Sequence, residues 1–252
     1  MPMEISWGTF QQIWCEEISI YPNTPAFNKL SIRMRLIRPG YLSLHSDLDL
    51  GLCGGATLRW CRMLFDHPGD TPLRRIERLT ADVEAIASTQ FLQEEIARWL
   101  PAYLRDESHS GEFFDSLCRV SRMKFSFAFK VPNPSEFEGI MKLNTLLKSN
   151  HIYLFCISST REEYNYVKGS VSLPEGHATA LAVDGNRAAK FFDIRLGEIK
   201  IDQGRLDHFW NEYWKYFSSP DIKINSLHGY SVEKLANQEI IETRPLQWQF
   251  GT

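Results

Sequence analysis

The chain has 252 residues and a formal net charge of −3, with 43% hydrophobic and 23% charged residues. These proportions are typical of a globular protein with a core of its own, and they exclude a largely disordered chain. The slightly acidic balance argues against a general nucleic-acid-binding protein, which would carry a strongly basic face. Two groups of arginines, within residues 33–38 and 74–78, are therefore expected to lie on solvated surface.

The cysteines are few and scattered, at positions Cys15, Cys53, Cys61, Cys118 and Cys156. An odd number without a Cys-x-x-Cys pair predicts neither a disulfide framework nor a thiolate zinc site, so no metal or other cofactor is expected. Free thiols are typical of a reducing compartment. The N-terminal residues lack the pattern of a cleavable secretory signal, and no apolar run is long enough to span a membrane.

The first half of the chain shows a mainly helical pattern. Residues 30–37 alternate apolar and polar side chains, which predicts one strand with a single buried face. From Cys53 to about Phe65, apolar residues recur every three or four positions, as they do on one face of a helix. The segment from Arg74 to about Phe129 continues this spacing and predicts three further helices.

The next part of the chain mixes a helix with strands. Ser135 is expected to cap a short helix that reaches Leu147, with Glu138 as the other half of a capping box. The continuous apolar run 152–157 predicts a central strand, and residues 158–176 are expected to form a polar loop. The pattern then predicts three strands and an aromatic helix, at 177–183, 189–194, 198–202 and 206–217.

A helix-rich first half followed by a strand-rich second half predicts an α+β fold. At this length, one domain over residues 1–252 is the expected organisation. It would consist of an N-terminal elaboration, a helical half and a sheet half, over residues 1–50, 51–130 and 131–252.

Cys53 has the setting of a nucleophile. It opens a predicted helix after a glycine-bearing loop, in the sequence Gly51-Leu-Cys53-Gly-Gly. A helix N-terminus favours thiolate over thiol, and its free amide groups can donate to an oxyanion. The two following glycines leave space for a substrate backbone. A buried structural cysteine is the alternative for Cys53 taken alone, and the other four cysteines are assigned to the core.

His177 and Asp193 are predicted to lie side by side. They occupy two predicted strands that are joined by a turn at residues 184–186. If that turn is centred on Gly185, the two residues are opposite each other and share one face of the hairpin. A carboxylate beside an imidazole orients the ring and stabilises its protonated form. The spacing alone therefore predicts the histidine and the aspartate of a Cys-His-Asp triad, with Cys53 as the candidate third member.

These three segments resemble the papain-like cysteine proteases, and among them the YopT/AvrPphB type of bacterial effector protease. The resemblance is carried by the cysteine segment with Trp60 further along its helix, by Gly-His177-Ala, and by Phe-Phe-Asp193-Ile-Arg-Leu-Gly-Glu. It implies a papain-like fold in which a helical half packs on an antiparallel sheet. It also implies cleavage of a specific host protein, after delivery by a bacterial injection system into the host cytosol.

One position departs from the papain-like pattern. These enzymes usually carry Gln or Asn five or six residues before the cysteine, as an oxyanion donor, whereas this chain has Asp47 and Leu48 there. A missing donor costs about a hundredfold or more in rate. Three alternatives to proteolysis therefore stay open: glutamine deamidation or transamidation, another acyl transfer on the same triad, and a binding module without catalysis.

Overall fold

The computed structural model describes residues 53–82, 121–165, 169–218 and 222–235, which contain four helices and one six-stranded sheet. In chain order the elements are α3 (Cys53–Asp66), α4 (Pro72–Ala81), β1 (Met123–Pro132), α7 (Phe137–Leu146), β2 (His151–Asn165), β3 (Gly169–Val183), β4 (Ala189–Asp193), β5 (Gly197–Ile201), α8 (Leu206–Phe217) and β6 (Ile222–Lys234). The strand predicted at 30–37 and the helices predicted between residues 83 and 120 lie outside the described residues.

The sheet is antiparallel throughout, with strand order β1-β6-β2-β3-β4-β5. Strands β2 to β5 follow one another as hairpins, while β6, the last strand in sequence, lies between β1 and β2. The expected strand at 152–157 belongs to β2, which is paired on both sides and is therefore central. This arrangement confirms the predicted α+β class.

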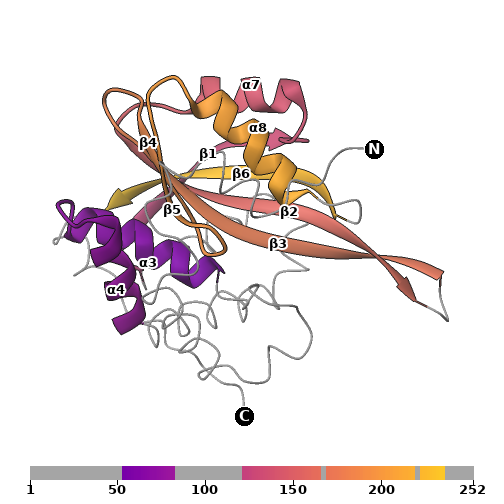
Figure 1. Ribbon diagram of the computed structural model, residues 1–252, viewed down its shortest axis with the longest axis horizontal. Helices are drawn as coiled ribbons and strands as arrows, with labels where there is room; N and C mark the ends of the chain where they lie inside the picture. The colour runs from indigo at the N-terminus through magenta and orange to yellow at the C-terminus, as the bar shows by residue number, and fades with distance from the viewer. Residues whose placement is uncertain (1–52, 83–120, 166–168, 219–221, 236–252) are drawn as a thin grey trace, which may run out of the picture.

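The two faces of the sheet carry separate apolar clusters because successive side chains of a strand point to opposite faces. Helix α3 packs on one face, where Ala178 and Ala180 of β3 belong to its cluster. Helices α7 and α8 pack on the other face, where Leu181 and Val183 of the same strand belong to theirs. Figure 1 shows α3 and α4 on one side of the sheet and α7 and α8 on the opposite side.

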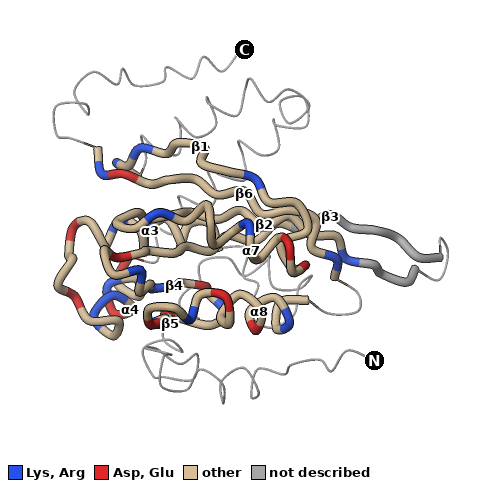
Figure 2. The backbone as a smooth tube through the Cα atoms, turned by 90° about the horizontal axis from the view of Figure 1, so that it is seen from above, with Lys and Arg blue, Asp and Glu red and all other residues tan. Residues whose placement is uncertain are grey.

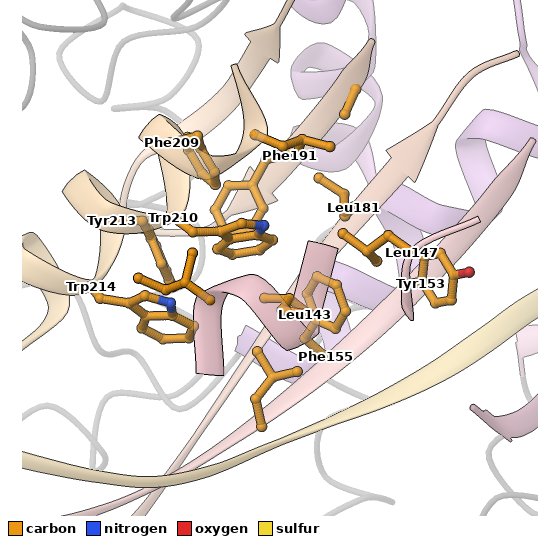
Figure 3. Close-up of a cluster of buried hydrophobic side chains, with 14 of the residues drawn as sticks. Leu143, Leu147, Tyr153, Phe155, Leu181, Phe191, Phe209, Trp210, Tyr213 and Trp214 are labelled. Carbon is orange, nitrogen blue, oxygen red and sulfur yellow. The ribbon is translucent and has the colours of Figure 1, made fainter. Parts of the chain in front are cut away.

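The aromatic stripe predicted at 206–217 is the core of the second face. The Phe191 ring of β4 lies 4.8 Å from Phe209, 5.7 Å from Trp210 and 4.9 Å from Tyr213, between ring centroids. Figure 3 shows Phe209, Trp210 and Tyr213 projecting from α8 towards the sheet, where Phe191 lies. Tilted and edge-to-face contacts of this kind add to the burial of aromatic surface. The stripe therefore fixes β4, and with it Asp193 at the end of that strand.

Charged residues of both signs are interspersed along the described chain (Figure 2). Within that part of the chain, no helix combines the length and the apolar character that crossing a membrane requires.

The sequence pattern predicted helices as far as about Phe129. The structure corrects the end of this helical segment, because residues 123–129 belong to strand β1. In this strand Met123, Phe129 and Val131 are buried, whereas Lys124 and Lys130 point to solvent. Aromatic and β-branched residues at every second position favour a pleated strand with one dry face.

The predicted polar loop at 158–176 is also wrong. Its residues extend β2 and β3 as a long hairpin, and the ladder runs from Ser158↔Gly176 to Asn165↔Gly169. The pairing is carried by main-chain hydrogen bonds and continues a register that the core fixes at Ile157↔His177. Because register is set where one face is buried, the outer part of the hairpin can follow the register of its inner part.

Helix α7 confirms the helix predicted at 135–147, but without the predicted capping box. Its N-cap residue is Glu136, which makes no side-chain capping bond.

Candidate active site

Cys53 is the first residue of α3, as the sequence predicts, and its side chain is buried at 8% exposure. The thiol lies at the end of the helix where backbone N–H groups have no partner within the helix, which favours a negative charge there. The start of α3 thus places a thiol and main-chain donors at one point.

Thr57, one turn further along α3, fixes the helix against the histidine strand. Its hydroxyl donates to the backbone carbonyl oxygen of Ala178 at 3.1 Å, and both residues are buried. The last β3–β4 pair is Ala180↔Phe192, so Ala178 lies beyond the end of β4. The helix therefore binds the edge of β3 where its neighbouring strand stops, next to His177.

His177 and Asp193 form a buried pair. The Nε2 atom of His177 lies 3.0 Å from Oδ2 of Asp193, and the exposed fractions of the two side chains are 2% and 0%. The other ring nitrogen, Nδ1, is buried without a hydrogen-bond partner. The Cys53 side chain interacts with this imidazole. Since Nε2 faces Asp193, Nδ1 is the nitrogen that remains for the thiol.

The hairpin that brings them together differs from the predicted one by its register. The pairs Val183↔Ala189 and Ala180↔Phe192 place the centre of the turn at Asn186 and not at Gly185. Continued to its end, this register sets Asp193 opposite Thr179, so that His177 and Asp193 are diagonal neighbours on one face. The prediction of a shared face is confirmed, and the prediction of direct opposition is wrong.

The turn itself explains this shift. The Oδ1 atom of Asp184 accepts the N–H groups of Asn186 and Ala188, each at 2.9 Å, and Arg187 adopts φ 62°. A three-residue loop that ends in a left-handed residue is a common hairpin connection, and an aspartate that binds the backbone two residues on stabilises it.

Asp193 uses its two carboxylate oxygens for different tasks. Oδ1 accepts the backbone N–H of Arg195 at 2.8 Å, which holds the β4–β5 turn before Gly197 at φ 86°. Oδ2 accepts from His177 at 3.0 Å and from the hydroxyl of Tyr213 at 2.8 Å. Part of the carboxylate's role is thus to form the turn, and the rest is to orient the imidazole.

The charges of this pair stabilise each other. Burial alone would lower the pKa of His177, but the Asp193 carboxylate outweighs it and raises that pKa to about 10, against the opposing charge of Arg195. Burial alone would raise the pKa of Asp193, but the imidazolium and the hydrogen bonds bring that pKa below its usual 3.8. The imidazole is therefore protonated at neutral pH and available as a proton donor.

This coupling predicts a stability profile against pH. The raised pKa of His177 contributes stability that is complete below pH 6.5 and is lost as the pH rises towards 10. The lowered pKa of Asp193 contributes stability that is present above pH 3.8 and is lost below it. We expect the free energy of unfolding of wild type to exceed that of Asp193→Asn most at pH 4–6.5, and progressively less towards pH 9.5. Urea denaturation at pH 5, 7.5 and 9.5 measures this, and a difference that does not change with pH contradicts the ion pair.

A second buried carboxylate links the helical half to the sheet. Glu198 of β5 accepts the indole N–H of Trp60 at 2.9 Å and forms a two-point ion pair with Arg75 of α4, at 2.8 and 2.5 Å. Arg75 also donates to the carbonyl oxygen of Asp70. Arg75 and Glu198 are only 1% and 2% exposed, so the prediction of solvated surface is wrong for Arg75.

Trp60 continues this link towards Asp193. Its ring stacks on Phe192 at 5.4 Å with an interplanar angle of 11°. Phe192 directly precedes Asp193 in β4. Trp60 and Glu198 both belong to the segments that resemble a known family, and the structure brings them into contact. Together with the stacking on Phe192, this contact fixes α3 relative to the strand that carries Asp193.

Two further cysteines of the described chain lie in apolar surroundings. Cys61 is fully buried in α3, and burial raises the pKa of its thiol far above the usual value. Burial, with a smaller contribution from Cys53, raises the pKa of Cys156 on β2 to about 12. The assignment to the core agrees with the structure for Cys61, whereas Cys156 is partly buried and packs against the edge of the cluster. Cys15, Cys118 and the oxyanion position at Asp47 and Leu48 lie outside the described residues.

Comparisons with known proteins give one structural likeness. No family model matches this sequence, and no curated protein matches it. Among solved structures, the crystal structure of the Pseudomonas avirulence protein AvrPphB superposes with a TM-score of 0.52. The match covers 72% of this chain and 91% of that chain. The two chains share one fold. This confirms the expected papain-like fold class, and at 16% identity the likeness is one of fold.

Sequence reasoning did not identify three residues that contact the site or fix its elements. Tyr213 was recognised only as one member of an aromatic stripe, and Arg75 only as one member of a basic group. Thr57 carried no signal at all, because a threonine inside an amphipathic helix is compatible with many contacts. For Arg75 the available signal was its position between two exposed arginines on a short helix whose other face is apolar.

Proposed function

We propose that this chain is a cysteine protease that cleaves a specific protein through Cys53, His177 and Asp193. The observation that carries the proposal is the buried His177–Asp193 pair, with the free Nδ1 left for the thiol of Cys53. A structural histidine would normally have both ring nitrogens satisfied or solvated, since an unpaired buried polar atom is costly. The fold shared with an avirulence protein adds support.

Each residue has one role in the proposed reaction. The Cys53 thiolate attacks the substrate carbonyl carbon, and the C–N bond breaks as the His177 imidazolium gives its proton to the leaving amine. The acyl group is then held as a thioester. The neutral imidazole next takes a proton from water, whose oxygen attacks the thioester and releases the acid and the thiol. Asp193 keeps the ring oriented and stabilises its charge throughout. Main-chain N–H groups at the start of α3 stabilise the oxyanion of both tetrahedral intermediates.

We propose further that the chain is a bacterial effector that acts on a host protein in the host cytosol, after delivery by an injection system. Two observations support this: the resemblance of its motifs to effector proteases, and the fold shared with an avirulence protein of Pseudomonas.

Alkylation provides a direct test of the nucleophile. We expect iodoacetamide to label Cys53 at least about tenfold faster than Cys61 or Cys156 at pH 6.5, because those two thiols are held protonated by burial. Reaction rates are read for each cysteine by mass spectrometry of the folded protein. His177→Ala should slow the labelling of Cys53, because it removes the imidazole that the proposed reaction pairs with this thiol. If another described cysteine reacts first, Cys53 is not the nucleophile.

A proteome comparison distinguishes proteolysis from the other acyl transfers. Wild type and Cys53→Ala are expressed in a eukaryotic cell, and peptide termini and glutamine modifications are compared. New termini that require Cys53 support the protease, whereas new Gln-to-Glu changes without new termini support a deamidase. The absence of both, combined with normal alkylation of Cys53, contradicts either activity on host proteins.

A further inference from the structure

The hydroxyl of Tyr213 lies at the centre of the proposed machinery. It donates to Oδ2 of Asp193 at 2.8 Å, the same oxygen that faces His177, and both Tyr213 and Asp193 are 0% exposed. Tyr213 comes from the middle of α8, and Figure 3 shows it within the aromatic cluster on that face of the sheet. The hydroxyl therefore reaches from the core to the carboxylate.

Packing alone does not account for a tyrosine at this position. The ring contacts Phe191 at 4.9 Å and Phe209 at 5.8 Å, and a phenylalanine would make the same contacts. A buried hydroxyl is costly unless it is hydrogen-bonded, and here its bond goes to a carboxylate. The neighbouring indole N–H groups of Trp210 and Trp214 are buried without a hydrogen-bond partner, whereas the Tyr213 hydroxyl meets a carboxylate.

The contact has two chemical consequences. Together with the N–H of Arg195 on Oδ1, it fixes the rotation of the Asp193 side chain, so that Oδ2 points at His177. It also withdraws charge from that oxygen, because the carboxylate is shared between two donors. Burial and the Asp193 charge raise the pKa of Tyr213 well above its usual value, which keeps the hydroxyl protonated and donating.

We propose that Tyr213 is a positioning residue that orients Asp193 and moderates its hold on the His177 proton. The inference rests on the proposed function, since it assigns Tyr213 a task in the same triad. Without the tyrosine donor, Oδ2 of Asp193 keeps more negative charge and stabilises the protonated form of His177 more strongly. The imidazolium then gives it up less readily, and a smaller fraction of neutral imidazole is present to activate water. The other titratable groups that act on this pair are Cys53, Arg195 and Tyr216.

The test is Tyr213→Phe, which removes one oxygen atom and keeps the ring. Histidine ring NMR of the full chain should show the pKa of His177 about one unit higher than in wild type. Steady-state hydrolysis of p-nitrophenyl acetate at pH 7.5 should fall about tenfold, because one pH unit changes the neutral fraction tenfold. The pH profile of that hydrolysis should move upward in parallel.

The matched control is Tyr153→Phe. Tyr153 is 2% exposed in the same cluster, and its hydroxyl accepts the backbone N–H of Lys148 at 2.9 Å, so the variant also loses one buried hydrogen bond. It should cost stability without changing the pKa of His177 or the pH profile. A wild-type pKa of His177 in Tyr213→Phe overturns the inference, as does an equal shift in both variants. If wild type hydrolyses the ester no faster than Cys53→Ala, the proposed function fails, and the NMR measurement still decides the role of Tyr213.

Discussion

Cys53→Ala and His177→Ala are each expected to reduce turnover by about 10⁴-fold or more, because the thiol forms the covalent intermediate and the imidazole moves every proton. The two losses should be similar, and the double variant should be no worse than either, since the residues act as one unit. Asp193→Ala should keep more activity, because a poorly oriented imidazole still transfers a proton. The measurement is the rate of thiol-dependent hydrolysis of p-nitrophenyl acetate or of a substrate found in the proteome comparison.

Cys156→Ala is the control for these variants. It removes a partly buried thiol from the same face of the sheet, and it should leave turnover close to that of wild type. If activity survives in Cys53→Ala but disappears in Cys156→Ala, the nucleophile is Cys156 on β2. That result would refute the proposed reaction.

Glu198→Ala is expected to reduce the free energy of unfolding by about 3–5 kcal/mol. The substitution removes the carboxylate that pairs with Arg75 at two points and leaves a guanidinium buried at 1% exposure without its counter-charge. It also leaves the indole N–H of Trp60 without its acceptor. Urea or thermal denaturation monitored by tryptophan fluorescence measures the loss, and activity should fall with it because α3 loses its link to β5.

One comparison variant, Glu77→Ala, separates the buried pair from an ordinary surface pair. Arg74 and Glu77 lie on the same helix, α4, with exposed fractions of 63% and 51%, and their charged atoms are 3.7 Å apart. Glu77→Ala should change stability by no more than about 0.5 kcal/mol, because exposed pairs contribute little. A loss of that small size in Glu198→Ala would show that water or another group compensates Arg75, and would contradict the assigned link.

The sequence was sufficient for those parts of the site that local chemistry determines. A cysteine after a glycine-bearing loop and before a helical pattern predicted the start of α3 to the residue. The alternation on either side of a turn predicted that His177 and Asp193 share a face. Their register was wrong because it depends on turn geometry: the Asp184 carboxylate and a left-handed Arg187 move the centre of the turn by one residue.

The remaining parts depend on contacts between distant segments, which no local pattern reports. Tyr213 meets Asp193 across 20 residues, and Trp60 meets Glu198 across 138. Strand β6 pairs with β1 and β2 without having been predicted at all, and the outer part of the β2–β3 hairpin continues the main-chain pairing of its inner part. Tertiary pairing decides such segments, and single-sequence periodicity does not show them.

The place of β6 in the sheet has a consequence for how the protein is made. This strand is the last of the described elements to leave the ribosome, yet it separates β1 from β2 and pairs with both. Until residues 222–234 are synthesised, β1 lacks the strand that it pairs with in the described part of the chain, and the side of β2 that pairs with β6 is an open edge. An open edge is a template for pairing with other chains. We therefore infer that folding is completed after synthesis of β6, and that chains interrupted before residue 222 aggregate instead of forming a smaller folded domain.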